Sequence, residues 1–142
     1  MSFEFRLKRR VHFYETDAAG IVHFSTYFRY MEEAEHALWR DAGLTIAQRS
    51  SDIGWPRVNA SFEYFRPLVF EQEFEAHIRI VEIAEKRIRY SCLLSSDGTR
   101  VAAGTMTIVC VSRRPKEQMK AVPIPAQILS HFQVAPEGEQ NS

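Results

Sequence analysis

The sequence has few cysteines, no net charge and no long apolar run, and each absence narrows what the protein can be. Its 142 residues include only two cysteines, Cys92 and Cys110, in no spacing typical of a metal site or a redox motif. No stretch approaches the roughly 20 apolar residues of a membrane helix. Lysine plus arginine equals aspartate plus glutamate at 18 each, so nothing indicates bulk attraction to nucleic acid or to an anionic membrane.

The N-terminus and the cysteines both favour the cytoplasm. Residues Met1–Arg10 are charged and lack the apolar run of a secretory signal peptide. If Ser96–Thr99 forms a hairpin turn, Cys92 faces a residue near Ala103 and Cys110 lies well beyond it, so we expect two reduced thiols. We therefore expect a cytoplasmic protein with no metal site, no nucleic-acid partner and no stable membrane insertion.

What the chain does contain is enough apolar material for one domain. Hydrophobic residues make up 45% of the sequence and aromatic residues 12%. A chain of this length buries roughly two thirds of its unfolded surface on folding. We expect a single domain over residues 1–132, followed by a flexible polar tail over residues 133–142.

One segment, from about Thr26 to Ala42, has the periodicity of a long helix. Its apolar residues recur at helical spacing and predict one buried face, made of Tyr27, Tyr30, Met31, Ala34, Ala37 and Leu38. Gly43 follows where helices commonly end, and one more helical turn is expected within Thr45–Ser51. The opposite face is polar and is expected to be solvated; it includes Glu32, Glu33, Glu35 and His36.

The other segments alternate apolar and polar residues, which predicts strands. The expected strands are Phe3–Phe13, Arg57–Phe65, Glu73–Ile80, Ile88–Leu94 and Val101–Ser112. In the third of them, His77 is expected to face solvent. Asp97-Gly98 predicts a tight hairpin turn, because glycine accepts the positive φ that such turns require. One helix inserted after the first strand of an antiparallel sheet predicts an α+β fold.

The loop Tyr14–Phe24 carries the strongest functional signal. It places the carboxylate of Asp17 shortly before the helix, beside small residues such as Gly20 that let a ligand approach the backbone. The start of the helix offers unpaired N–H groups and a partial positive charge. A carboxylate and such amides together can attack and polarise a carbonyl. Spacing alone still favours a turn-capping role for Asp17.

A family resemblance changes that balance. The loop and the helix resemble the active-site signature of the 4-hydroxybenzoyl-CoA thioesterase family, through Asp17-x-x-Gly20-x-Val22-x-Phe24-x-x-Tyr27. The likeness continues in Trp55–Phe62, Arg66–Leu68 and Met119–Pro125, and therefore reaches about Phe132. It implies the hotdog fold, in which an antiparallel sheet of about five strands wraps around one long central helix. It also implies a homodimer with sheets joined edge to edge, or a homotetramer.

The resemblance implies an acyl-CoA thioesterase that hydrolyses an acyl- or aroyl-CoA to the free acid and CoA. Asp17 matches the catalytic carboxylate, acting as nucleophile or general base, and N–H groups around Val22–Phe24 would polarise the carbonyl. His23 is a second catalytic candidate, but related branches carry Tyr-His or two aromatics at positions 23 and 24. The histidine is therefore equally compatible with a wall of the site. No cofactor is implied beyond the CoA of the substrate.

Further residues are expected to contact the substrate. Gly20, Val22, Phe24 and Tyr27 are candidates from the motif, and Asn59 and Ser61 from a strand beside the helix. The phosphates of CoA require cationic contacts, for which the candidates are Lys86, Arg87 and Lys120; Arg113-Arg114 is a further basic pair.

Two other functions remain open at this level. A hotdog hydratase or dehydratase needs a histidine and a carboxylate, which Asp17 and His23 could mimic. A non-catalytic acyl-CoA binding protein needs only the pocket. Some hotdog thioesterases of other branches use a helix glutamate, but with Asp17 present we expect Glu32, Glu33 and Glu35 to be solvated.

Overall fold

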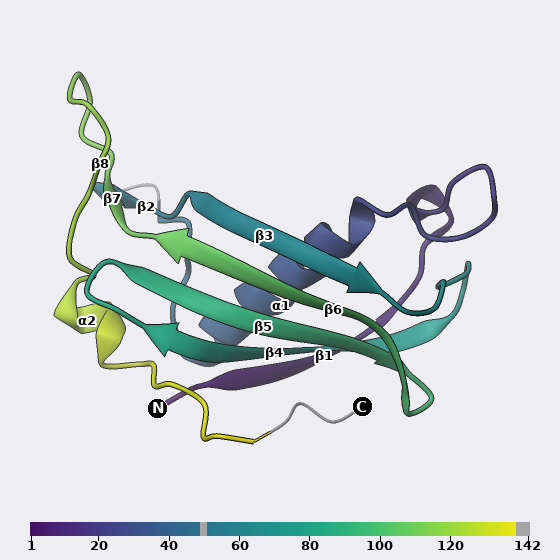
Figure 1. Ribbon diagram of the computed structural model, residues 1–142. Coiled ribbons are helices and arrows are strands. Elements are labelled where there is room, and N and C mark those ends of the chain that lie inside the picture. The colour runs from purple at the N-terminus through teal and green to yellow at the C-terminus, as the bar shows by residue number, and fades with distance from the viewer. Residues whose placement is uncertain (49–50, 139–142) are drawn as a thin grey trace.

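A five-stranded antiparallel sheet and one long helix form the two layers of the computed structural model, which describes residues 1–48 and 51–138 (Figure 1). The strand order is β1-β4-β5-β6-β3. The strands are β1 (Glu4–Arg10), β3 (Arg57–Tyr64), β4 (Glu73–Ile83), β5 (Arg87–Ser96) and β6 (Thr99–Val109). Helix α1 (Thr26–Asp41) lies against one face of the sheet, so the predicted α+β architecture is confirmed.

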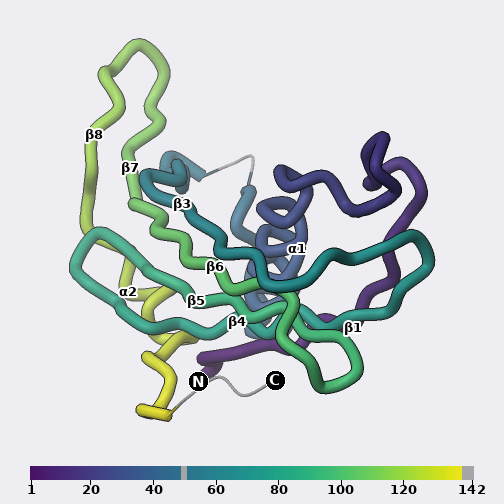
Figure 2. Tube along the Cα trace, turned by 45° about the vertical axis from the view of Figure 1, so that its right-hand side comes forward, coloured from purple at the N-terminus to yellow at the C-terminus, as the bar shows by residue number. Residues whose placement is uncertain are grey.

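Shorter elements lie at the two ends of this sheet. A three-stranded sheet with the order β2-β7-β8 consists of β2 (Ile53–Gly54), β7 (Val111–Ser112) and β8 (Lys120–Ala121). The chain between β7 and β8 projects away from the main sheet (Figure 2). A 3-10 turn, η1 (Phe13–Glu15), precedes the loop at the opposite end, and α2 (Ala126–Leu129) follows β8.

Local sequence signals explain the best-defined parts. The residues that recur at helical spacing in α1 are buried as expected, and Gly43 follows the helix with φ of +83°. In the β5–β6 turn, Asp97 and Gly98 both have positive φ, which matches the right-handed twist of the strands they join. Cys92 and Cys110 are buried free thiols, as expected. Burying each large apolar side chain of the helix stabilises the fold by about 1.5–3 kcal/mol.

Three local expectations are wrong: contacts with distant elements bury Glu35 and His77, and the first strand ends before Phe13. Glu35 is fully buried on α1, and His77 is only 4% exposed on β4, where its Nε2 bonds Glu4. Phe13 is 72% exposed, because β1 ends at Arg10 and η1 turns the chain outward. The helical turn expected within Thr45–Ser51 falls partly on residues 49–50, which lie outside the described ranges, and stays a prediction; the N–H of Ser51 donates to the carbonyl of Gln48.

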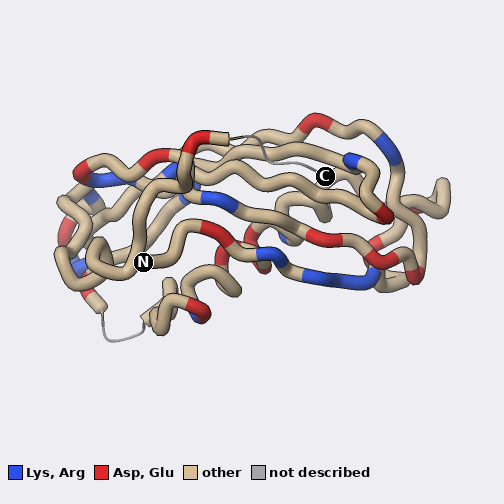
Figure 3. The backbone as a smooth tube through the Cα atoms, turned by 90° about the horizontal axis from the view of Figure 1, so that it is seen from below, with Lys and Arg blue, Asp and Glu red and all other residues tan. Residues whose placement is uncertain are grey.

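Basic and acidic residues are interspersed along the backbone (Figure 3). None of the described helices is long and apolar enough to cross a membrane. Residues 133–138 run beside β4: the N–H of Ala135 donates to the carbonyl of Ile80, and Arg79 donates to the carbonyls of Pro136 and Gly138. The rest of the predicted flexible tail, residues 139–142, lies outside the described residues.

Candidate active site

Asp17 lies at the start of a tight turn between η1 and α1. Its Oδ1 accepts the N–H of Ala19 at 2.8 Å, and its own N–H donates to the carbonyl of Ile21 at 2.8 Å. Gly20 supplies the positive φ, +82°, that the turn requires. The Asp17 side chain is partly exposed. The turn-capping role is therefore present, but it uses only one of the two carboxylate oxygens.

A buried ionic network holds this loop against the helix. Glu15, 7% exposed, accepts hydrogen bonds from Arg9, from the N–H of His12 and from the hydroxyl of Tyr30. Arg9 also donates to Glu33 of α1 and lies over the Tyr30 ring. Burial raises the pKa of Glu15, but these donors outweigh it and hold the pKa below the ordinary value of 4.5. No motif or spacing in the sequence singles out Glu15.

The backbone amides at the helix start are not all available. The N–H of Val22 donates to Leu68 and the N–H of His23 donates to Glu15, at 2.8 and 2.9 Å. Of the three amides expected to polarise a carbonyl, only that of Phe24 has no partner among the described residues. The phenyl ring of Phe24 is 66% exposed, and its carbonyl accepts the hydroxyl of Tyr64 from the end of β3.

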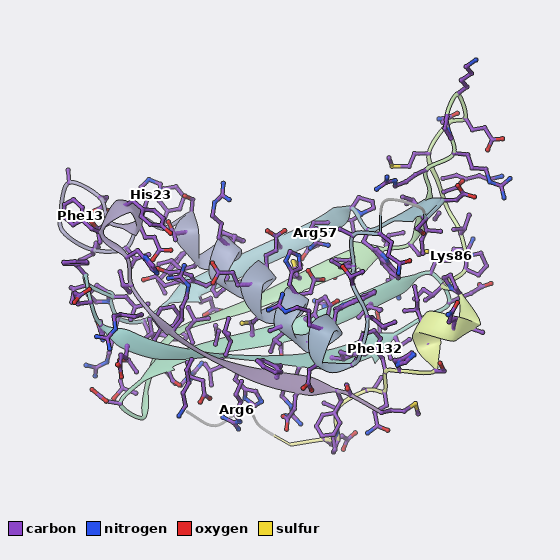
Figure 4. All side chains as sticks on the ribbon, turned by 180° about the vertical axis from the view of Figure 1, so that it is seen from behind. Arg6, Phe13, His23, Arg57, Lys86 and Phe132 are labelled. Carbon is purple, nitrogen blue, oxygen red and sulfur yellow. The ribbon has the colours of Figure 1, made fainter. Side chains whose placement is uncertain are left out.

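His23 lies near Asp17 in sequence but is bonded elsewhere. Its Nδ1 lies 2.8 Å from Oγ of Ser25, and its ring stacks on Phe24. Figure 4 labels His23 close to Phe13, at the end of the molecule that carries the loop. Both roles predicted for His23, as a wall of the site and as a catalytic residue, stay untested predictions.

A cleft of about 440 Å³ opens between α1 and the edge strand β3. It begins at Ser25, the residue before the helix, and ends at Arg57 on β3. Phe28, Met31, Ala60 and Met106 give it apolar walls, and Arg29 and Glu32 add charge. The sequence places Met31 and Glu32 on opposite faces of the helix but does not group them with β3, because strand and helix meet only in the folded chain.

A β-bulge in β3 decides which of its residues face the cleft. The register against β6 shifts between Arg57 and Asn59, so that Arg57 and Ala60 both face the helix. Asn59 and Ser61 lie on the other face, where Ser61 bonds Thr105 at 2.9 Å. The predicted substrate contacts of Asn59 and Ser61 therefore find no support in the position of the cleft.

The other predicted substrate residues divide into two groups. Val22 and Tyr27 are buried, and Tyr27 packs its ring against Tyr30, Phe62 and Tyr64. Both side chains belong to the hydrophobic core. Gly20 and Phe24 are exposed and accessible to a ligand.

The predicted CoA-binding residues lie together, but far from Asp17 within one chain. The carbonyl of Lys86 accepts the N–H of Cys110, and Lys120 on β8 pairs with β7, so both belong to the end that carries the projecting hairpin. Lys86, Arg87 and Lys120 are exposed, and Arg87 is paired with Glu82. Figure 4 labels Lys86 and His23 at opposite ends of the molecule.

Glu35 is the least expected feature near the cleft. Its Oε1 accepts a hydrogen bond from Arg57, and the hydroxyl of Tyr90 also lies against the carboxyl. Burial raises the pKa of Glu35 to about 7, against the opposing charge of Arg57. Within the described residues, no three histidine, cysteine or acidic side chains are grouped so as to hold a metal ion.

Comparison with known proteins identifies the family to which this chain belongs. The model of the thioesterase-like superfamily matches residues 11–132. A presumed esterase of Aquifex aeolicus is 37% identical over 88% of this chain and 94% of its own. A 1,4-dihydroxy-2-naphthoyl-CoA hydrolase of Thermosynechococcus vestitus is 28% identical over 92% of this chain and 89% of its own.

A solved structure confirms the architecture. The 4-hydroxybenzoyl-CoA thioesterase of Pseudomonas sp. strain CBS-3 superposes with a TM-score of 0.82 and 19% identity, over 92% of this chain and 100% of that one. At this identity the likeness shows the fold and not the activity. The predicted hotdog fold is therefore confirmed.

Proposed function

The chain belongs to the thioesterase-like superfamily and is a thioester hydrolase, and from this premise we propose that it hydrolyses acyl- or aroyl-CoA with Asp17 as the catalytic carboxylate. The observation that carries the proposal is the joint position of Asp17 and the unpaired N–H of Phe24, at the two ends of one short loop. The first supplies a carboxylate oxygen and the second a hydrogen-bond donor, as acyl transfer requires.

The reaction follows from these two groups. The thioester carbonyl oxygen accepts the N–H of Phe24 at the positive end of the α1 dipole, which stabilises the charge that develops there. Asp17 either attacks the carbonyl carbon or removes a proton from an attacking water. If Asp17 attacks, the C–S bond breaks to give a mixed anhydride of the acyl group and Asp17, and water then cleaves the anhydride and regenerates the carboxylate. If water attacks, its oxygen displaces the sulfur directly. In both routes CoA leaves as its thiolate and takes up a proton, and the oxygen of water ends in the free acid. Water is the only co-substrate.

Aroyl groups are the acyl class we favour. The cleft that starts at Ser25 has an aromatic wall in Phe28 and apolar walls in Met31 and Met106. The hydrolase of Thermosynechococcus vestitus is named for an aroyl-CoA. A flat ring fits between a helix and a strand with little loss of conformational entropy.

We extend the proposal to a homodimer joined along β3, or a homotetramer of two such dimers. Strand β3 is at the edge of the sheet and offers a row of backbone groups to a further strand. A two-fold axis pairs two β3 strands antiparallel and brings the Arg57 end of one beside the Tyr64 end of the other. The basic end of one copy, with Lys86 and Lys120, then approaches the Asp17 loop of its partner. Two copies would thus complete a site whose halves lie apart in one chain.

The cytoplasm is the compartment we propose, because both cysteines are free thiols and acyl-CoA hydrolysis requires no oxidising environment.

Thiol release from a panel of aliphatic and aromatic acyl-CoAs tests the activity. Release from at least one member is expected, and release from none contradicts the proposal. Hydration of an enoyl-CoA without thiol release would favour a hydratase instead. Light scattering tests the assembly: a mass of two or four times 16.5 kDa is expected, and a fully active monomer contradicts the shared site.

A further inference from the structure

The cleft between α1 and β3 has a defined length and a charged far end. Its lining runs along the helix from Ser25 to Glu32, and Arg57 of β3 lies at the Glu32 end. Helical rise over that interval gives about 10 Å. An acyl group whose carbonyl lies at the helix start therefore extends toward Arg57, the residue that Figure 4 labels beside the helix.

Arg57 is held in a fixed position at that end. Its Nη2 donates to the carboxylates of both Glu35 and Glu32, and its Nη1 donates to the carbonyl of Trp55 at 2.9 Å. A guanidinium has five N–H donors in a planar fork, so donors remain for a ligand. The side chain is 27% exposed and lines the cleft.

The burial of Glu35 is difficult to explain by stability alone. Placing a carboxylate out of water costs several kcal/mol, and an apolar side chain of similar volume often serves a core as well or better. Glu35 is fully buried, and besides Arg57 its carboxyl faces the Tyr90 hydroxyl, which is itself bonded by the Trp39 indole. What the carboxylate does provide is an anchor for one specific rotamer of Arg57.

The charges at this end select one kind of ligand group. Arg57 donates hydrogen bonds, whereas the neighbouring Glu32, 46% exposed, accepts them. A hydroxyl can accept from the first and donate to the second. A carboxylate would be repelled by Glu32, and a purely apolar end would leave the free donors of Arg57 desolvated.

We propose that Arg57 is a specificity-determining residue that binds a hydroxyl at the far end of the acyl group, and that Glu35 is the positioning residue that holds it. This inference rests on the proposed thioesterase activity and assigns a role to two residues within it. Because the contact lies about 10 Å from the carbonyl, it acts mainly on substrate binding rather than on the chemical step.

The test compares two substrates that differ in one group: naphthoyl-CoA and its analogue with a hydroxyl on the ring carbon furthest from the carbonyl. The wild type is expected to prefer the hydroxylated thioester by about tenfold or more in kcat/KM. Arg57→Met is expected to reduce that ratio to about two or below, and Glu35→Gln to reduce it through KM, with kcat less affected. Equal rates on both substrates in the wild type would overturn the inference.

Two further variants keep the test decisive. Arg57→Met leaves Glu35 unpaired and could unfold the chain, so the double variant Glu35→Met with Arg57→Met replaces the pair by apolar groups and should fold. If it folds and retains the full preference, the inference is wrong. Arg6→Met is the matched control, because Arg6 is also paired with a glutamate, Glu75, but on the other face of the sheet; its ratio should equal that of the wild type. Thiol release from other acyl-CoAs but from neither naphthoyl thioester would overturn the inference alone, whereas absence of release from the whole acyl-CoA panel would contradict the proposed function.

Discussion

Arg9 and Glu15 form a two-point ion pair under the loop that carries Asp17. Nη2 of Arg9 donates to Oε2 of Glu15 at 2.6 Å, and Nη1 donates to Oε1 at 2.9 Å. The same Oε1 accepts the Tyr30 hydroxyl at 2.9 Å. Because the carbonyl of Glu15 also accepts the N–H of His23, the pair fixes both ends of the loop relative to the helix.

Glu15→Gln is therefore expected to destabilise the fold by about 3 kcal/mol, since Arg9 loses a buried partner charge. The pKa of Glu15 lies below 4.5, so its contribution is present above that pH and is lost as the pH falls through the folded-state pKa. Urea denaturation at pH 7 and at acid pH measures both effects. Glu75→Gln, which removes a more exposed partner of Arg6, is the control and should cost under about 1 kcal/mol. An equal cost for both variants would contradict the prediction.

Glu35 is expected to have the opposite pH dependence. Burial raises its pKa from 4.5 to about 7 despite the charge of Arg57, so the folded state binds the proton more tightly than the unfolded state. Its stabilising effect is complete below pH 4.5 and is lost as the pH rises toward 7, over a range of about 3 kcal/mol. Glu32, His36 and Tyr90 also lie close to this carboxyl and contribute to its field.

The comparison with Glu35→Gln isolates this residue from the other titrating groups. The difference in unfolding free energy, wild type minus variant, should fall between pH 5 and pH 8. A difference that is constant or rises with pH would show that Glu35 is ionised throughout.

Local signals explain why much of the fold could be predicted from sequence. Helix α1 has a clear apolar period, and the Asp97-Gly98 turn needs only two residues of the right kind. Such features depend on neighbours within a few positions. Burial of Glu35 depends on Arg57, 22 positions away, and burial of His77 on its place within the sheet beside Glu4, 73 positions away. Helical periodicity therefore assigned Glu35 to solvent, and strand alternation did the same for His77.

The site was predictable only in part for the same reason. Asp17 and Phe24 lie in one loop, so a motif could identify them. The cleft needs the β3 bulge to turn Arg57 and Ala60 toward the helix, and no residue type marks that bulge in the sequence. Whether Lys120 approaches Asp17 depends on a second copy of the chain, which no single sequence displays.

Gly104 tests how tightly the sheet packs under the helix. A Cβ at this position would lie 2.7 to 2.9 Å from three ring atoms of Phe62, closer than such contacts allow. Gly104→Ala is expected to cost about 1–3 kcal/mol by thermal or urea unfolding, because Phe62 is held by Tyr27 and Phe28 and must shift. Adding Phe62→Leu should recover part of the loss. Strict additivity of the two changes would show that they do not compete for the same space.

Asp17→Asn separates the two roles that the structure allows for this residue. Asparagine keeps the oxygen that accepts the N–H of Ala19, so the turn should persist and the unfolding free energy should change by less than about 1 kcal/mol. It removes the negative charge that a nucleophile or general base needs, so thiol release from acyl-CoA should fall by about 10²-fold or more. Asp97→Asn makes the same chemical change in the β5–β6 turn, at a positive φ that asparagine tolerates, and should leave the rate unchanged. If Asp17→Asn releases thiol at close to the wild-type rate while remaining folded, Asp17 only caps its turn, and the catalytic carboxylate must be sought on the helix.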